Sequence, residues 1–167
     1  EYSNILSALS LAYLKIGDES KSREHYLQAL AAARESGDRS AAAYASFAAG
    51  EHYYWQYDGG RALEHYSEAS RIWKELGETR HLVEALIAIS YVSMMRGNAS
   101  EGLGHAREAE TLARGINGRR AIALSQIAVG HLSSFLNEKQ AALESYAQAG
   151  AIFPEHLDLQ ERGALLN

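Results

Sequence analysis

The 167 residues amount to about one domain, with 47% hydrophobic residues, 22% charged residues, no cysteine and a net charge of −5. The 29 alanines argue against a β-sandwich or barrel, the lack of cysteine excludes disulfides and thiolate metal sites, and the acidic balance argues against nucleic acid as a partner. The longest uncharged run, 121–137, is too short and too polar to cross a membrane, so no membrane partner is expected. Either redox compartment suits a chain without cysteine, and the cytoplasm is the expected location.

Pairs of helices are predicted to recur along the chain every 40 residues. The first helix of each pair ends at one of four evenly spaced turns: Gly17-Asp18, Tyr57-Asp58, Gly97-Asn98 and Asn137-Glu138. The second helix ends at residue types that tolerate the left-handed conformation of a helix C-cap: Gly37, Gly77 and Asn117. The predicted units are therefore 3–42, 43–82, 83–122 and 123–162, followed by a truncated fifth unit at 163–167.

Three positions of the 40-residue unit hold a small residue in every unit. They are Ser10, Gly50, Ser90 and Gly130; Ser22, Ala62, Gly102 and Ala142; and Ala29, Ala69, Ala109 and Ala149. Alanine, glycine and serine together make up 60 of the 167 residues, so only about four of these twelve positions would be small by chance. We expect the helices to approach each other closely at these positions.

The second unit resembles the tetratricopeptide repeat (TPR). Gly50 and Tyr53 match the pattern of its first helix, and Ala62, Tyr66 and Ala69 match that of its second. The usual TPR unit has 34 residues, and longer 40-residue units are similar to the arrays of bacterial signal-transduction proteins, including those that precede caspase-like CHAT protease domains. The resemblance implies an all-α fold, a right-handed α-solenoid of helix-turn-helix repeats.

The first helices of TPR proteins line a concave groove, and the resemblance assigns groove positions in this chain. Aromatic residues and methionine are enriched there, as they are where partners dock, so a peptide or an amphipathic helix is the expected ligand. The alternative is that these side chains pack between units as core. The candidate peptide-binding residues are Lys15, Tyr44, Phe47, Glu51, Tyr54, Trp55, Glu84, Tyr91, Met94, Met95, His131 and Phe135.

The charges in this groove argue against one known TPR ligand. Chaperone-binding TPR proteins hold a C-terminal carboxylate with lysine, asparagine and arginine, whereas here the matching positions are mostly alanine, aromatic or aliphatic. Glu51 and Glu84 are acidic, and Lys15 is the only basic groove residue. An apolar or mildly basic ligand is therefore expected.

No catalytic, cofactor or metal site is predicted. His25, His65 and His105 share one repeat position, but stacked helices lie about 10 Å apart, too far for three ligands of one metal ion. These histidines are interpreted as solvated surface residues, and no serine, histidine and aspartate stand out as a triad.

Two functions remain open. The first is a non-catalytic protein-protein interaction module, the sensing or scaffolding part of a multidomain bacterial protein of which this array is a fragment. The second is a structural spacer or self-assembly element without a groove ligand. Repeat arrays usually end in a polar capping helix, and none is evident here, so self-association through the apolar C-terminal end at Leu165-Leu166 is the expected route of assembly.

Overall fold

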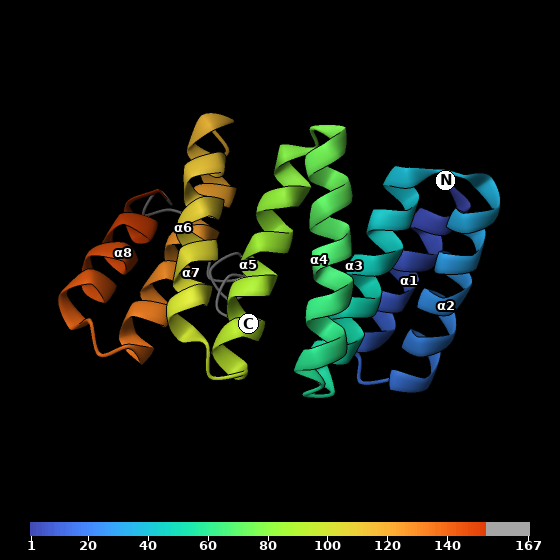
Figure 1. Ribbon diagram of the computed structural model, residues 1–167, viewed down its shortest axis with the longest axis horizontal. Coiled ribbons are helices and arrows are strands. Elements are labelled where there is room, and N and C mark those ends of the chain that lie inside the picture. Colours follow the sequence, from blue (N-terminus) through green and yellow to red (C-terminus); the bar gives the residue numbers. More distant parts are fainter. Residues whose placement is uncertain (153–167) are drawn as a thin grey trace.

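The computed structural model describes residues 1–152, and these form eight α-helices without a strand. The helices are α1 (Tyr2–Lys15), α2 (Glu19–Ser36), α3 (Arg39–Trp55), α4 (Gly59–Leu76), α5 (Thr79–Met95), α6 (Ala99–Gly115), α7 (Arg119–Phe135) and α8 (Lys139–Ile152). Each packs against the next, and α1 also packs against α3 and α5 against α7, so the helices follow one another across the molecule (Figure 1). The predicted all-α solenoid is confirmed.

The predicted fifth unit, 163–167, and the apolar end at Leu165-Leu166 lie outside the described residues. Within residues 1–152, no helix has the length and apolar character needed to span a bilayer. Each first helix begins one to four residues before the predicted start of its unit, at Tyr2, Arg39, Thr79 and Arg119.

One kind of turn joins the helices and recurs every 20 residues. The residues with positive φ are Gly17, Gly37, Tyr57, Gly77, Gly97, Asn117 and Asn137. At six of these seven turns, the next backbone N–H donates to the carbonyl five residues earlier, as Asp18 does to Tyr13 at 2.9 Å. This is the Schellman arrangement, which satisfies carbonyls that a helix end leaves unpaired. The seven helix ends predicted between Gly17 and Asn137 are therefore confirmed.

Tyr57 is the one bulky side chain among these left-handed residues. Its φ is 59° and its side chain is 86% exposed, so few side-chain contacts offset the free-energy cost of the left-handed backbone. A left-handed residue with a Cβ costs about 1–2 kcal/mol. We expect Tyr57→Gly to raise the free energy of unfolding by about 1 kcal/mol, as measured by urea denaturation. Gly97→Ala, at the equivalent turn, should lower it, and a Tyr57→Gly protein less stable than wild type would contradict this reading.

The twelve small residues of the repeat are all buried, as predicted. Two of the glycines lie under a tyrosine ring of the following helix. A Cβ on Gly50 would come within 2.6 Å of Tyr66 Cδ1, and one on Gly130 within 2.6 Å of Tyr146 Cε1. The absent side chain thus makes room for an aromatic ring between the two helices of a pair.

The joints between successive helix pairs differ in their packing. Ala45 of α3 is fully buried against Leu6 and Ala29, so α1 and α3 lie close together. No such close packing joins α3 to α5, because aromatic side chains fill the space around Trp73. Phe47 lies 5.6 Å from Trp73 between ring centroids. The second joint is therefore wider than the first.

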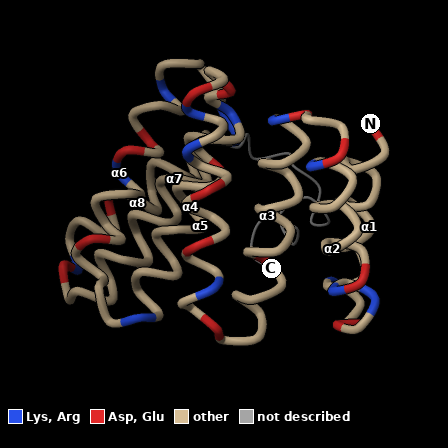
Figure 2. The backbone as a smooth tube through the Cα atoms, turned by 45° about the vertical axis from the view of Figure 1, so that its right-hand side comes forward, with Lys and Arg blue, Asp and Glu red and all other residues tan. Residues whose placement is uncertain are grey.

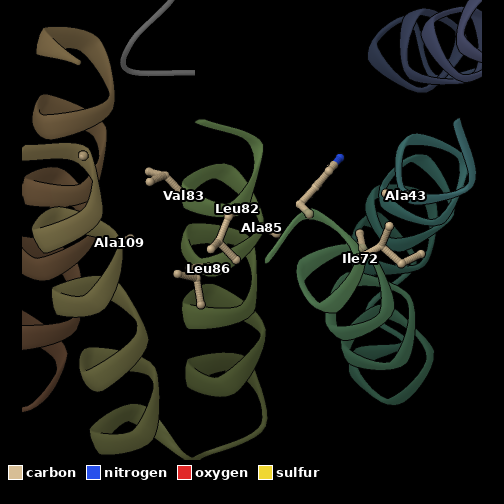
Figure 3. Packing of buried hydrophobic residues seen from close by; sticks show 10 residues of the cluster. Ala43, Ile72, Leu82, Val83, Ala85, Leu86 and Ala109 are labelled. Atoms are coloured by element: carbon tan, nitrogen blue, oxygen red, sulfur yellow. The ribbon is translucent and has the colours of Figure 1, made fainter. Parts of the chain in front are cut away.

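Aliphatic side chains complete the core around α5. Val83 points from α5 towards Ala109 of α6, and Ala43 and Ile72 lie on the other side of α5 (Figure 3). Leu82 and Leu86 belong to the same cluster and are 6% and 4% exposed. Helix α5 is thus enclosed by the helices before and after it. This packing holds in place one of the first helices that carry the candidate site.

Candidate functional site

Four polar-tipped aromatic side chains on α3, α5, α7 and α8 make up a set that we call the aromatic ladder: Tyr54, Tyr91, His131 and Tyr146. The Tyr91 hydroxyl lies 3.1 Å from Nδ1 of His131, and the rings of His131 and Tyr146 are 5.6 Å apart. Tyr54 packs against the core cluster that contains Ile89 and Val92 of α5, the helix that carries Tyr91. The ladder thus joins α3, α5, α7 and α8.

The tyrosines of the ladder are hydrogen-bond donors at neutral pH. Burial raises the pKa of Tyr91 to about 12, with further contributions from Tyr54 and Tyr146. Burial also raises the pKa of Tyr54 and of Tyr146. A protonated phenol offers one O–H donor and an aromatic face, so the ladder can contact both the polar backbone and the apolar side chains of a ligand.

Glu51 places a half-buried carboxylate beside the ladder. Its Oε1 accepts a hydrogen bond of 2.6 Å from the Tyr66 hydroxyl. Burial raises the pKa of Glu51, whereas Tyr66, Lys15 and Trp55 act in the opposite direction. No cationic side chain within residues 1–152 comes within ion-pair distance of it. The carboxylate can therefore accept a cationic group from a ligand.

A second polar cluster lies at the wider joint. The Tyr44 hydroxyl contacts Nε2 of His81, and Nδ1 of His81 lies 3.0 Å from Oε2 of Glu78. The Tyr44 ring also packs edge-on against Trp73 at 5.4 Å. Tyr44 is thus held by core contacts as well as by His81, while the neighbouring Glu84 is exposed.

Three other candidates support the packing more than they line a surface. Phe47 is half-buried with its ring 5.3 Å from that of Tyr66. Met94 and Met95 are half-buried and pack against separate core clusters on either side of α5. In contrast, Trp55 and Phe135, at the last residues of α3 and α7, are 59% and 64% exposed.

The remaining candidates fall between these groups. Lys15 is exposed at the last residue of α1, and His131 is exposed although burial lowers its pKa. The side chains that offer both exposure and aromatic or charged chemistry are Lys15, Trp55, Glu84, His131 and Phe135.

Sequence reasoning missed three residues that shape the site. His81 lies in the first turn of a first helix, and Tyr66 and Tyr146 lie on second helices, so none occupies a groove position assigned by the TPR resemblance. The sequence held a signal for the two tyrosines. In units two and four, Gly50 and Gly130 are each followed 16 residues later by a tyrosine.

The predicted surface histidines are partly enclosed. His25 stacks on Tyr13 at 5.1 Å and His65 on Tyr53 at 5.5 Å, with nearly parallel rings. His105 is half-buried as well, and its Nε2 lies 3.9 Å from a Glu101 carboxylate oxygen. The interpretation as solvated surface residues was wrong for His25 and His65, because each lies half-buried against a tyrosine of the first helix. The same tyrosines carry Lys21 and Arg61 over their rings at 5.1 and 5.2 Å. Among the described residues, no group of three or more metal-ligating side chains converges.

Another histidine is buried within the first joint. His52 is 1% exposed, and its Nδ1 lies 3.2 Å from the Ser22 hydroxyl. Burial lowers the pKa of His52, Glu19 opposes this shift, and Arg23 adds to it. Burial therefore favours the neutral form of His52 in the folded protein.

We expect the free energy of unfolding to fall as the pH drops below about 6.5, the usual histidine pKa, because the unfolded chain then binds a proton that folded His52 does not. Above that pH this contribution is fully present. Urea denaturation between roughly pH 5 and pH 8 should show a shallower slope for His52→Gln than for wild type. His65 and His131, whose pKa values are also lowered by burial, contribute to the slope that remains in the variant. Equal slopes in the two proteins would contradict the assignment.

The fold is similar to solved structures of helical proteins. A Rap protein complexed with competence and sporulation factor aligns with a TM-score of 0.83 and 16% identity, over 90% of this chain and 42% of that one. The apo form of RapI gives 0.80 and 16%, over 90% and 56%. BtubC from P. vanneervenii gives 0.78 and 16%, over 93% and 67%. The chain thus spans less than half the length of the first of these.

Neither a protein-family model nor a curated protein sequence matches the chain. At 16% identity the structural likeness shows a shared fold, a TPR-like array of helix pairs, and nothing more specific.

Proposed function

We propose that the chain is a non-catalytic interaction module that binds a peptide or an amphipathic helix along the aromatic ladder and the adjoining Trp55. The observation that carries the proposal is the ladder itself. It brings together phenol and imidazole groups from four helices. The exposed Trp55 ring lies 6.2 Å from that of Tyr54, and the exposed Phe135 follows His131 by four residues on α7. Aromatic anchors of this kind dominate the energetics of protein interfaces.

The structural comparison supports a peptide ligand. One of the proteins with a similar fold was solved in complex with competence and sporulation factor. A helical array of this kind therefore has a documented ligand complex, and we extend that role to this chain as the sensing or scaffolding part of a multidomain bacterial protein.

The charge of the site favours a ligand with a basic side chain. Glu51 is half-buried beside Tyr54 and Trp55, and Glu84 is exposed on the next first helix. A lysine or arginine side chain would meet both a carboxylate and aromatic faces there. Lys15 lies at the Glu51 end and would disfavour a basic residue only at that edge.

The experiment selects peptides from a random display library on the immobilised chain and measures their affinity by fluorescence titration. We expect enriched peptides to carry lysine or arginine more often than aspartate or glutamate. Tyr91→Ala should weaken their binding by about tenfold or more, because a central aromatic anchor is lost. Tyr2→Ala, which removes an exposed tyrosine on α1 away from the ladder, is the control and should bind as wild type does.

Two results would overturn the proposal. One is a selection that enriches no peptide above a bare support, and the other is equal affinity for the wild-type and Tyr91→Ala proteins. Circular dichroism of Tyr91→Ala must show unchanged helix content, because lost helicity would place Tyr91 in the core instead.

A further inference from the structure

The turn between α3 and α4 differs from the six other turns in the described part of the chain. Each of those places glycine or asparagine at its left-handed position, whereas this turn places Tyr57 there with φ of 59°. The Tyr57 side chain is 86% exposed, and within residues 1–152 its ring joins no aromatic or cation–π pair. Contacts inside the folded chain therefore do not account for a tyrosine at this position. Residues held in costly backbone conformations cluster where a protein contacts its ligands.

Tyr57 extends the aromatic surface of the ladder past the end of α3. The rings of Tyr54 and Trp55 lie 6.2 Å apart and nearly perpendicular, and the Tyr57 N–H donates to the Tyr54 carbonyl at 3.0 Å. Exposure rises in the same order, from half-buried Tyr54 through 59% at Trp55 to 86% at Tyr57. A peptide on the ladder can therefore reach Tyr57 over neighbouring aromatic side chains.

Two unpaired carboxylates lie close to this turn. Arg39 and Glu51 are the only lysine, arginine, aspartate or glutamate residues of α3, so Figure 2 draws most of this helix as uncharged. Glu51 lies one helical turn before Trp55, and Glu19 accepts a hydrogen bond of 3.4 Å from the Gln56 side chain. Neither carboxylate forms an ion pair within residues 1–152. A basic side chain of a ligand is therefore favoured here.

Other tyrosines of the chain show which group such a ring accepts. Lys21 lies over the Tyr13 ring at 5.1 Å, and Arg61 lies over the Tyr53 ring at 5.2 Å. A cation is attracted to the electron-rich face of an aromatic ring, and arginine also stacks its planar guanidinium on that face. The Tyr57 ring offers the same face to the solvent, with no cation from residues 1–152 above it.

We propose that Tyr57 is a further contact residue for the peptide ligand, and that an arginine or lysine of the bound peptide stacks on its exposed ring at the end of α3. This inference rests on the proposed function, because it requires a peptide on the aromatic ladder. Glycine at this position would relax the turn but would present no surface to the ligand. The tyrosine thus lowers stability and adds a binding contact.

Tyr57→Gly tests the inference, because its two expected effects have opposite directions. The variant should unfold at a higher urea concentration than wild type, yet bind about threefold to tenfold more weakly. The probe is the peptide most enriched in the display selection on the wild-type chain, and fluorescence titration measures its affinity. A residue with only a structural role would leave this affinity unchanged.

Three controls separate the ring from the turn. Tyr57→Phe keeps the aromatic face and should bind as wild type does. Asn137→Gly makes the same kind of backbone change at the equivalent turn of unit four without removing a ring, and it should also bind as wild type does. Replacing the basic residues of the probe peptide by alanine, one at a time, should identify one whose loss weakens binding to wild type more than to Tyr57→Gly.

The outcomes distinguish this inference from the proposed function. Equal affinity of wild type and Tyr57→Gly, with weaker binding by Tyr91→Ala, would overturn the Tyr57 contact alone. Equal affinity of all three proteins, or a selection that enriches no peptide, would overturn both. Tyr57→Phe that binds as weakly as Tyr57→Gly, or Asn137→Gly that loses as much affinity, would also refute stacking on the Tyr57 ring.

Discussion

Trp73→Ala is expected to lower the free energy of unfolding by about 3–5 kcal/mol, the range for truncating a large aromatic side chain in a core. Trp73 is 1% exposed and fills the wide joint, with the Tyr44, Phe47 and His81 rings 5.3–5.6 Å away. Its indole N–H finds no hydrogen-bond partner among residues 1–152, so the loss comes from packing. Urea denaturation, monitored by circular dichroism, measures this loss in the free energy of unfolding.

The matched control is Trp55→Ala. Trp55 is 59% exposed, and the same truncation there should change the free energy of unfolding by no more than about 0.5 kcal/mol. These are the only two tryptophans. Each variant therefore keeps one tryptophan, whose fluorescence reports on the surroundings of that remaining residue. Comparable losses in the two variants would contradict the assignment of Trp73 to the core and Trp55 to the surface.

Gly102→Ala is expected to cost about 1–3 kcal/mol, although alanine is the better helix former. A Cβ at this position would lie 2.5 Å from the Ser90 carbonyl oxygen and 2.6 Å from Leu132 Cδ2. A backbone atom cannot turn away as a side chain can, so α5 and α6 would have to separate.

Gly104→Ala measures the effect of helix propensity on stability without a steric clash. It lies two residues later on α6, and nothing would come within 4 Å of its Cβ. The substitution should raise the free energy of unfolding by about 0.5–1 kcal/mol through helix propensity. Thermal or urea unfolding of both variants gives the comparison, and a stabilised Gly102→Ala protein would show that the helices are not in close contact there.

The repeat predicted the fold well because turns and close contacts depend on backbone chemistry. Gly37, Gly77 and Asn117 mark helix ends through their tolerance of positive φ, and the structure places a left-handed residue at each. The small residue at Gly102 likewise indicated a close approach of helices. Tyr57 shows the limit of this reasoning, because its residue type alone does not predict a left-handed turn.

The candidate site was less predictable because a groove position does not determine burial. Phe47, Met94 and Met95 hold groove positions yet are half-buried against core clusters, since the distance between first helices varies from joint to joint. Tyr146 and His81 were missed because they reach the site from outside the assigned positions. The repeat spacing indicates where helices approach closely, but it does not show which side chains of other helices reach the site.

Within residues 1–152, extensive packing joins only helices that are no more than two apart along the chain, which also bears on how the protein folds. Each pair can form its contacts without waiting for distant segments, so the entropy lost in closing loops is small. A chain of this topology reaches its native state on the microsecond to millisecond scale typical of helical proteins. Any helix pair can serve as the nucleus from which order spreads to its neighbours.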